Sequence, residues 1–219
     1  MAKKAENIVN IFSFIPKEIS SEAFFTWLLN FLDSSPNCQM LHQVLFNRLI
    51  LKQEDVGRGI KFVSIMSNGD GKSAILTFRF NGSDSEHNVL LVFGDAINAM
   101  DDYNKLRQYS RMFPKCYRYF YYKIKYVNTF EEQIVSSEQF DLISAGMMET
   151  ILGSMEHLDH QILSYKNYLR SEADSMNRYH EKIFLQHDKY ALQEGGAQKY
   201  LFDAVMDNIA EDNWNIKFQ

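Results

Sequence analysis

The chain has 219 residues, of which 46% are hydrophobic, and it carries a net charge of −5. This length fits one domain overall, which we expect to consist of an α/β core at residues 1–135 and a helical extension at residues 136–219 packed on that core. The apolar content excludes a disordered chain, and the negative charge excludes a protein that binds nucleic acid through its whole surface.

The sequence predicts a cytoplasmic protein without a membrane partner. No apolar run follows the first residues, and no stretch of about 18 apolar residues occurs, so neither a signal peptide nor a membrane span is expected. The two cysteines, Cys38 and Cys116, are too few for a disulfide framework, which favours a reducing compartment.

Two helices are predicted to open the chain. A short apolar segment at residues 7–15 ends at Pro16. Ser20 or Ser21 is then suited to cap a helix, which is apolar nearly all round over residues 23–32 and should therefore be buried. A second helix is expected at residues 40–51.

A three-stranded meander should follow, at residues 60–66, 73–80 and 89–93, because the segments between these strands are rich in turn-forming Gly, Asn, Asp and Ser. A helix at residues 98–112 then leads to a fourth strand at residues 117–127. This strand lies beyond a crossover, so it should run parallel to its neighbour. The expected fold class is α/β, with a mixed central sheet flanked by helices.

The remainder of the chain is predicted to be mostly helical, with helices at residues 140–152, 157–192 and 197–210. Gly195-Gly196 is suited to end the second of these helices. The tail at residues 213–219 alternates between polar and apolar side chains, a pattern that suits an edge strand.

Two short motifs are weak signals. Residues 71–73 read Gly-Lys-Ser, but the glycine that a phosphate-binding loop needs five residues earlier is missing and a β-rich segment follows, so a hairpin turn is favoured. His157 and His160 share one helix face, as a metal site would require. No third ligand can be named for them, which favours a solvated helix face.

The segment between residues 105 and 125 is basic, with seven Lys or Arg and no acidic residue, although acidic residues outnumber basic ones in the rest of the chain. Aromatic residues are interleaved with the basic ones, a combination that suits a phosphate backbone and stacked bases. The alternative interpretation is a solvated helix face followed by a half-buried strand. The candidate nucleic-acid-binding residues are Lys105, Arg107, Arg111, Lys115 and Arg118.

Two segments resemble a known family. Residues 21–30 read Ser-Glu-Ala-Phe-Phe-Thr-Trp-Leu-Leu-Asn after Asn10-Ile-Phe12, and residues 93–99 read Phe-Gly-Asp-Ala-Ile-Asn-Ala before Lys105-Leu-Arg-Gln-Tyr109. They are similar to a bacterial branch of the PD-(D/E)XK nuclease superfamily, in which an opening helix S-x-F-L-x-W-L-L-D precedes a core I-E-N-K-I-x-A and then Q-L-x-x-Y. The resemblance follows the order of elements over residues 7 to 170 and implies a restriction-endonuclease-like core.

In such enzymes, an Asp on one strand and a Glu-x-Lys on the next hold Mg²⁺ and the attacking water, and the metal lowers the pKa of that water. Carried over to this chain, the Glu position is Gly94, the Lys position is Ala96, and the Asp position falls at or near Ala74. Small residues at these three positions imply that the metal site is lost, so no cofactor is expected.

The resemblance leaves three functions open. The favoured one is an inactive nuclease-like protein that binds DNA or RNA, or a protein partner, in DNA processing or defence. The second is an active Mg²⁺-dependent nuclease with migrated groups, in which Lys105 replaces the strand lysine. Its carboxylates would then come from Glu22, Asp84, Glu86, Asp101 or Asp102. The third is a helical interaction module at residues 140–210 that forms a homodimer and has no role with nucleic acid.

Overall fold

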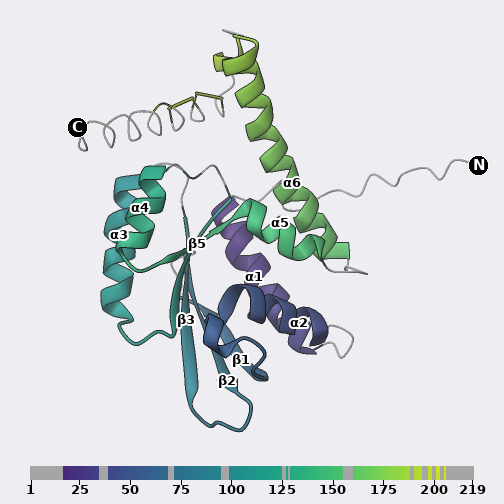
Figure 1. Cartoon of the computed structure of the whole chain (residues 1–219), viewed down its shortest axis with the longest axis vertical. Coiled ribbons are helices and arrows are strands. Elements are labelled where there is room, and N and C mark those ends of the chain that lie inside the picture. The colour runs from purple at the N-terminus through teal and green to yellow at the C-terminus, as the bar shows by residue number, and fades with distance from the viewer. Residues whose placement is uncertain are drawn as a thin grey trace, which may run out of the picture.

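The structure is a computed structural model (Figure 1). It describes residues 17–34, 39–68, 72–94, 99–124, 127, 129–154, 160–187, 190–193, 197–198, 201–202 and 205.

Helix α1 (Lys17–Ser34) opens the described chain, and helix α2 (Gln39–Leu45) runs directly into the π-helical segment η3 (Phe46–Ile50). Phe24, Phe25 and Leu28 of α1 are buried, as the predicted all-round apolar character of this helix requires. The short 3₁₀ turn η4 (Gln53–Asp55) then leads into the sheet.

A mixed five-stranded sheet forms the centre of the molecule, with the strand order β1-β2-β3-β4-β5. The first three strands pair antiparallel, whereas β3, β4 and β5 are parallel to one another. The predicted meander and the parallel fourth strand are therefore confirmed. The strands are β1 (Ile60–Ser67), β2 (Ser73–Phe80), β3 (Glu86–Phe93), β4 (Arg118–Lys123) and β5 (Asp141–Ser144).

Two crossover helices cover one face of the sheet, because each parallel connection needs a helix between its strands. Helix α3 (Ala99–Met112) joins β3 to β4, and helix α4 (Thr129–Ser137) joins β4 to β5. Helices α1, α2, α5 (Ala145–Gly153) and α6 (His160–His180) lie on the other face, so the molecule has three layers (Figure 1).

Each face of the sheet has its own hydrophobic core. The larger core joins β1–β5 to α1, α5 and α6, and it includes Leu91, Phe93 and Tyr122. The smaller core, beneath α3 and α4, contains Leu90, Val92 and Tyr121. Residues 89–93 of β3 and 120–123 of β4 are thus buried, with side chains on both faces, which explains the continuous apolar run at residues 89–93.

The helix predicted at residues 140–152 is wrong in its first half. Residues 141–144 form β5, and Ser144 then caps α5 by accepting a hydrogen bond from the backbone N–H of Met147. The chain turns just before β5 at Gln139, whose φ of 65° is in the left-handed region. Helix α4 was not predicted at all. Its first-turn acids, Glu131 and Glu132, are a recognisable signal for a helix start.

The long C-terminal helix ends earlier than predicted. Helix α6 runs into the π-helical segment η5 (Glu181–Leu185), and a separate 3₁₀ turn η6 (Ala191–Gln193) follows. Residues 197, 198, 201, 202 and 205 are helical, in agreement with the last predicted helix.

Some predictions concern residues outside the described ranges. These are the Asn10-Ile-Phe12 segment, Cys38, Gly71, Ala96, His157, Gly195-Gly196 and the tail at residues 213–219. Within the described part of the chain, none of the helices combines the length and the apolar character that crossing a membrane requires.

Candidate functional site

The resemblance places the catalytic centre where β3 ends. Gly94 directly follows β3 and donates its backbone N–H to the carbonyl of Tyr122 at 2.8 Å, which extends the pairing of β3 with β4 by one residue. Since side chains alternate along a strand, position 94 faces the same way as Val92, towards the layer of α3 and α4.

The ring of Tyr121 occupies the space in front of Gly94. A Cβ atom on residue 94 would come within 2.8 Å of Cε2 of Tyr121, and closer still to its phenol oxygen. Tyr121 is buried, with 1% of its surface exposed, so its ring has little room to move aside. The position that carries the metal-binding Glu in the resembled family is therefore filled by an aromatic ring.

The two residues at or near the expected Asp position face opposite sides of the sheet. Ala74 pairs with Leu91 and belongs to the larger core, on the opposite face of the sheet from position 94. Ser73 pairs with Val92 and therefore faces the α3 side. It is fully buried, and its Oγ accepts a hydrogen bond from Nδ2 of Asn68 at 2.9 Å. The residue that shares a face with Gly94 is thus a serine engaged in a local contact.

A buried ion pair lies beside these positions. Lys123, the last residue of β4, contacts the carboxylate of Glu131 in the first turn of α4 through its Nζ atom. Both side chains are at least 94% buried. The pairing register puts Lys123 next to Gly94. The two opposite charges near the expected centre therefore neutralise each other.

The proposed migrated groups whose side chains are described do not gather at this point. Glu22 is buried on α1, whereas Lys105 is half-buried on α3, and these helices cover opposite faces of the sheet. Glu86 begins β3, at the far end from Gly94, and pairs with Arg79 at 2.5 Å. Asp84 lies in the turn just before β3, at that same far end. The side chains of Asp101 and Asp102 are outside the described residues.

In the described part of the chain, no three His, Cys, Asp or Glu side chains are grouped closely enough to hold a metal ion. His160 is exposed at the start of α6.

Apart from the half-buried Lys105, the basic residues of α3 are exposed, and Lys115 lies in the turn after this helix. Arg107 makes an ion pair from its Nε to Oε1 of Glu138 at 3.5 Å, with half of the arginine side chain exposed. Arg111 and Lys115 are exposed. We call Arg107, Arg111 and Lys115 the basic surface.

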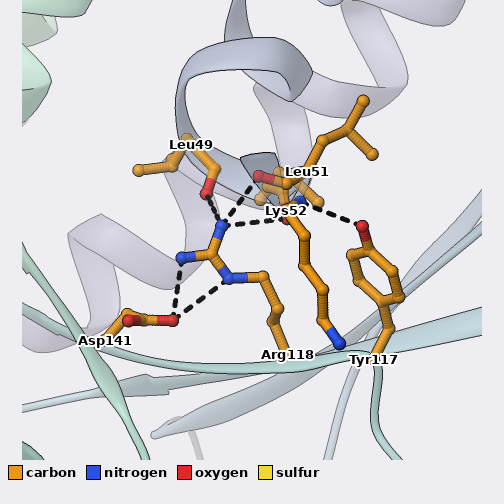
Figure 2. Close-up of polar contacts among 7 residues, drawn as sticks. Leu49, Leu51, Lys52, Tyr117, Arg118 and Asp141 are labelled. Atoms are coloured by element: carbon orange, nitrogen blue, oxygen red, sulfur yellow. Dashed lines mark hydrogen bonds and ion pairs between the residues drawn. The ribbon is translucent and has the colours of Figure 1, made fainter. Parts of the chain in front are cut away.

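Arg118 has a structural position instead. Its Nη1 donates to the carbonyls of Leu49, Ile50 and Leu51 at 3.2, 3.4 and 2.9 Å, where η3 ends. Its Nε and Nη2 both donate to Oδ2 of Asp141, at 3.1 and 2.8 Å (Figure 2). These five contacts tie the end of η3 to the edge strand β5, so the guanidinium is directed into the fold rather than towards a ligand.

The neighbouring residue Tyr117 adds further hydrogen bonds beside those of Arg118 (Figure 2). Its phenol accepts the backbone N–H of Lys52 at 2.9 Å and donates to Oδ2 of Asp55 at 2.6 Å. Burial, followed by the hydrogen bond to Asp55, raises the pKa of Tyr117 to about 12. Hydrogen bonds from Tyr117 and Arg58 lower the pKa of the Asp55 carboxyl.

A pocket of about 310 Å³ lies where α3 and α4 end. Its lining comes from the last turn of α3 and the turn after it, from β4, and from the end of α4 with the turn after it. The lining residues are Ser110, Arg111, Pro114, Tyr119, Ser137, Glu138 and Gln139.

Sequence reasoning placed Tyr121 only among the interleaved aromatic residues, and it missed Glu131, Glu138 and Gln139. Tyr121 belongs to a Tyr-rich strand that the sequence predicts, but its contact with Gly94 depends on how β4 pairs with β3. The other three became visible only with α4 in place.

Comparisons of the chain with protein-family models, with curated proteins and with solved structures find no match.

Proposed function

We propose that this chain has a PD-(D/E)XK nuclease-like core that has lost cleavage and acts by binding nucleic acid. The order of elements supports the first part. A buried opening helix, a three-stranded meander, a crossover helix and a Tyr-containing parallel strand follow one another as the resemblance predicts.

The contact between Gly94 and Tyr121 is the observation that carries the loss of cleavage. A carboxylate at position 94 would need the volume that the Tyr121 ring fills. The neighbouring Lys123 is bound to Glu131 and is almost completely buried. Mg²⁺ needs several oxygen ligands, and the described residues bring no such group together.

The basic surface supports the binding part. Arg107 and Arg111 lie one turn apart on α3, and the exposed Lys115 follows in the turn after this helix, so the three residues offer nearby contacts for one stretch of phosphate backbone. Phosphate contacts of this type give affinity without sequence preference and weaken as salt is added.

The loss of cleavage is tested by incubating the purified chain with plasmid DNA and with RNA, in the presence of Mg²⁺ or Mn²⁺. We expect no metal-dependent cleavage. Cleavage that requires the metal and disappears in Lys105→Ala would overturn this part of the proposal and favour an active enzyme with migrated groups.

Binding is tested by fluorescence anisotropy with single-stranded and duplex DNA over a range of salt concentrations. The double variant R111S/K115S should reduce the slope of log affinity against log salt by about 1 for each contact removed. The matched control is K61S/R178S, which removes two exposed positive charges on β1 and α6 and should keep the wild-type slope. Equal slopes for both double variants, or a complete lack of binding, would contradict the proposal and leave a protein partner as the better interpretation.

A further inference from the structure

The pocket at the ends of α3 and α4 adjoins the basic surface and shares Arg111 with it. Its volume of about 310 Å³ is at the small end of ligand pockets, which range from about 300 to 1,000 Å³. A ligand of one ring system fits this size, and the shared Arg111 places the pocket beside the basic surface.

The polar lining is rich in hydrogen-bond acceptors. The Ser110 and Ser137 hydroxyls donate to the backbone carbonyls of Arg107 and Ile134 at 3.1 and 2.8 Å, so their oxygens remain as acceptors. The Glu138 carboxylate is 13% exposed and lines the same pocket. Helices α3 and α4 both end here, and the C-terminal ends of helix dipoles are negative. A ligand that presents N–H donors therefore fits this part of the lining, whereas Arg111 lines the pocket as a donor.

The pocket also has an apolar surface and one adaptable amide. Pro114 and Tyr119 provide the apolar part, and the Tyr119 ring is held by a hydrogen bond from its phenol to the carbonyl of Phe113 at 2.7 Å. Gln139 lines the pocket from a backbone with a φ of 65°, which non-glycine residues rarely adopt. Such conformations concentrate at functional sites.

We propose that this pocket receives one guanine base of a single-stranded nucleic acid whose phosphates contact the basic surface, an inference that rests on the proposed function. Guanine is the base with two adjacent donors, N1–H and the N2 amine, and this pair matches the two oxygens of a carboxylate such as Glu138. Its O6 accepts an N–H from the Gln139 amide. Unstacked bases are read in this way, with stacking on an aromatic side chain and hydrogen bonds to the Watson–Crick edge.

Oligonucleotides test this directly by fluorescence anisotropy. The probes are a single strand of about 12 thymidines, a length within the range of known single-strand sites, and the same strand with one central dG or one central deoxyinosine. The dG strand should bind about tenfold tighter than the thymidine strand, since tenfold lies within the range that a good bidentate base contact provides. Inosine lacks the N2 amine, so its strand should bind nearly as weakly as the thymidine strand.

The variant Glu138→Gln separates base reading from backbone binding. It should abolish the preference for dG, so that the dG and thymidine strands bind this variant equally. Its melting by circular dichroism shows whether it folds, and the inosine strand makes the same test without any change in the protein. Equal affinity for the thymidine and dG strands would overturn the guanine pocket while leaving the proposed function in place. Failure to bind any of the strands would overturn both.

Discussion

Gly94 and Tyr121 are packed so closely across β3 and β4 that no side chain can be added at residue 94 without displacing the tyrosine ring. The ring is itself buried in the smaller core with Leu90 and Val92. The place where the resembled family holds its metal is therefore filled by packed side chains. Residue 94 must be glycine because the Tyr121 ring occupies the volume that a side chain would need.

Gly94→Ala should destabilise the fold by about 1–3 kcal/mol, as over-packing of a core does. The cost should fall when Tyr121 is replaced by Leu, because the methyl group then has room. Urea denaturation of the two single variants and the double variant measures this coupling. Gly146→Ala is the control, since its Cβ would meet only Ser144 Oγ at 4.0 Å and should be tolerated in helix α5. Additive effects of the changes at residues 94 and 121 would show that the contact is not the reason for the glycine.

Glu131→Gln should cost about 3–5 kcal/mol of folding free energy, because it leaves the buried Lys123 ammonium without its opposite charge. The double change K123M/E131L removes both charges and should be less destabilising than Glu131→Gln alone. Chemical denaturation at neutral pH compares them. If the double variant is the least stable of the set, Lys123 and Glu131 have further roles in this part of the fold.

Arg118→Ala should cost about 3 kcal/mol, since it removes charge-assisted hydrogen bonds to three carbonyls at the end of η3 and to Asp141. Asp141→Ala should cost about 1 kcal/mol or less, because this carboxylate is half exposed. Arg111→Ala is the matched arginine control on the surface and should change stability by no more than about 0.5 kcal/mol. If Arg118→Ala leaves the stability unchanged and weakens DNA binding, Arg118 contacts nucleic acid rather than stabilising the fold.

Tyr117 and Asp55 should make stability depend on pH at both extremes. The pKa of Asp55 is lowered from 3.8, so its stabilisation is present above that pH and is lost as the pH falls further. The pKa of Tyr117 is raised from 10.0 to about 12, so its stabilisation is present below pH 10 and is lost as the pH rises towards 12.

Tyr117→Phe keeps the ring and removes both hydrogen bonds, so it should lower stability at neutral pH by about 1 kcal/mol and flatten both limbs of the pH profile. Thermal melting across the pH range measures this. A variant with the same acid and alkaline limbs as the wild type would show that other groups control them.

Much of the fold follows from the sequence, because periodicity and turn residues are local signals. The strands at residues 60–67 and 73–80 and the helix at 99–112 are of this kind. Strand β5 could not be recognised, because Asp141-Leu-Ile-Ser144 is too short for a strand pattern and adjoins an apolar helix. Its identity comes from pairing with β4, through partners such as Phe120 and Asp141.

The candidate site was harder to predict because it depends on register and on distant contacts. A difference of one residue decides whether position 73 or position 74 faces Gly94, since alternate side chains point to opposite faces. Arg118 and Arg111 lie in the same basic segment rich in aromatic residues, so the sequence does not tell their roles apart. The structural role of Arg118 comes from the carbonyls of Leu49–Leu51, which lie nearly 70 residues earlier in the chain.

The position of β5 also limits how the chain can be divided. A fragment that stops at residue 135 would lose the strand that covers β4 and would leave the backbone amides and carbonyls of that strand exposed along the sheet edge. Bare edges of this kind recruit strands from other molecules. Proteolysis of the chain after residue 135 would therefore produce fragments that self-associate. A laboratory fragment should extend at least through Ser144 to remain monodisperse.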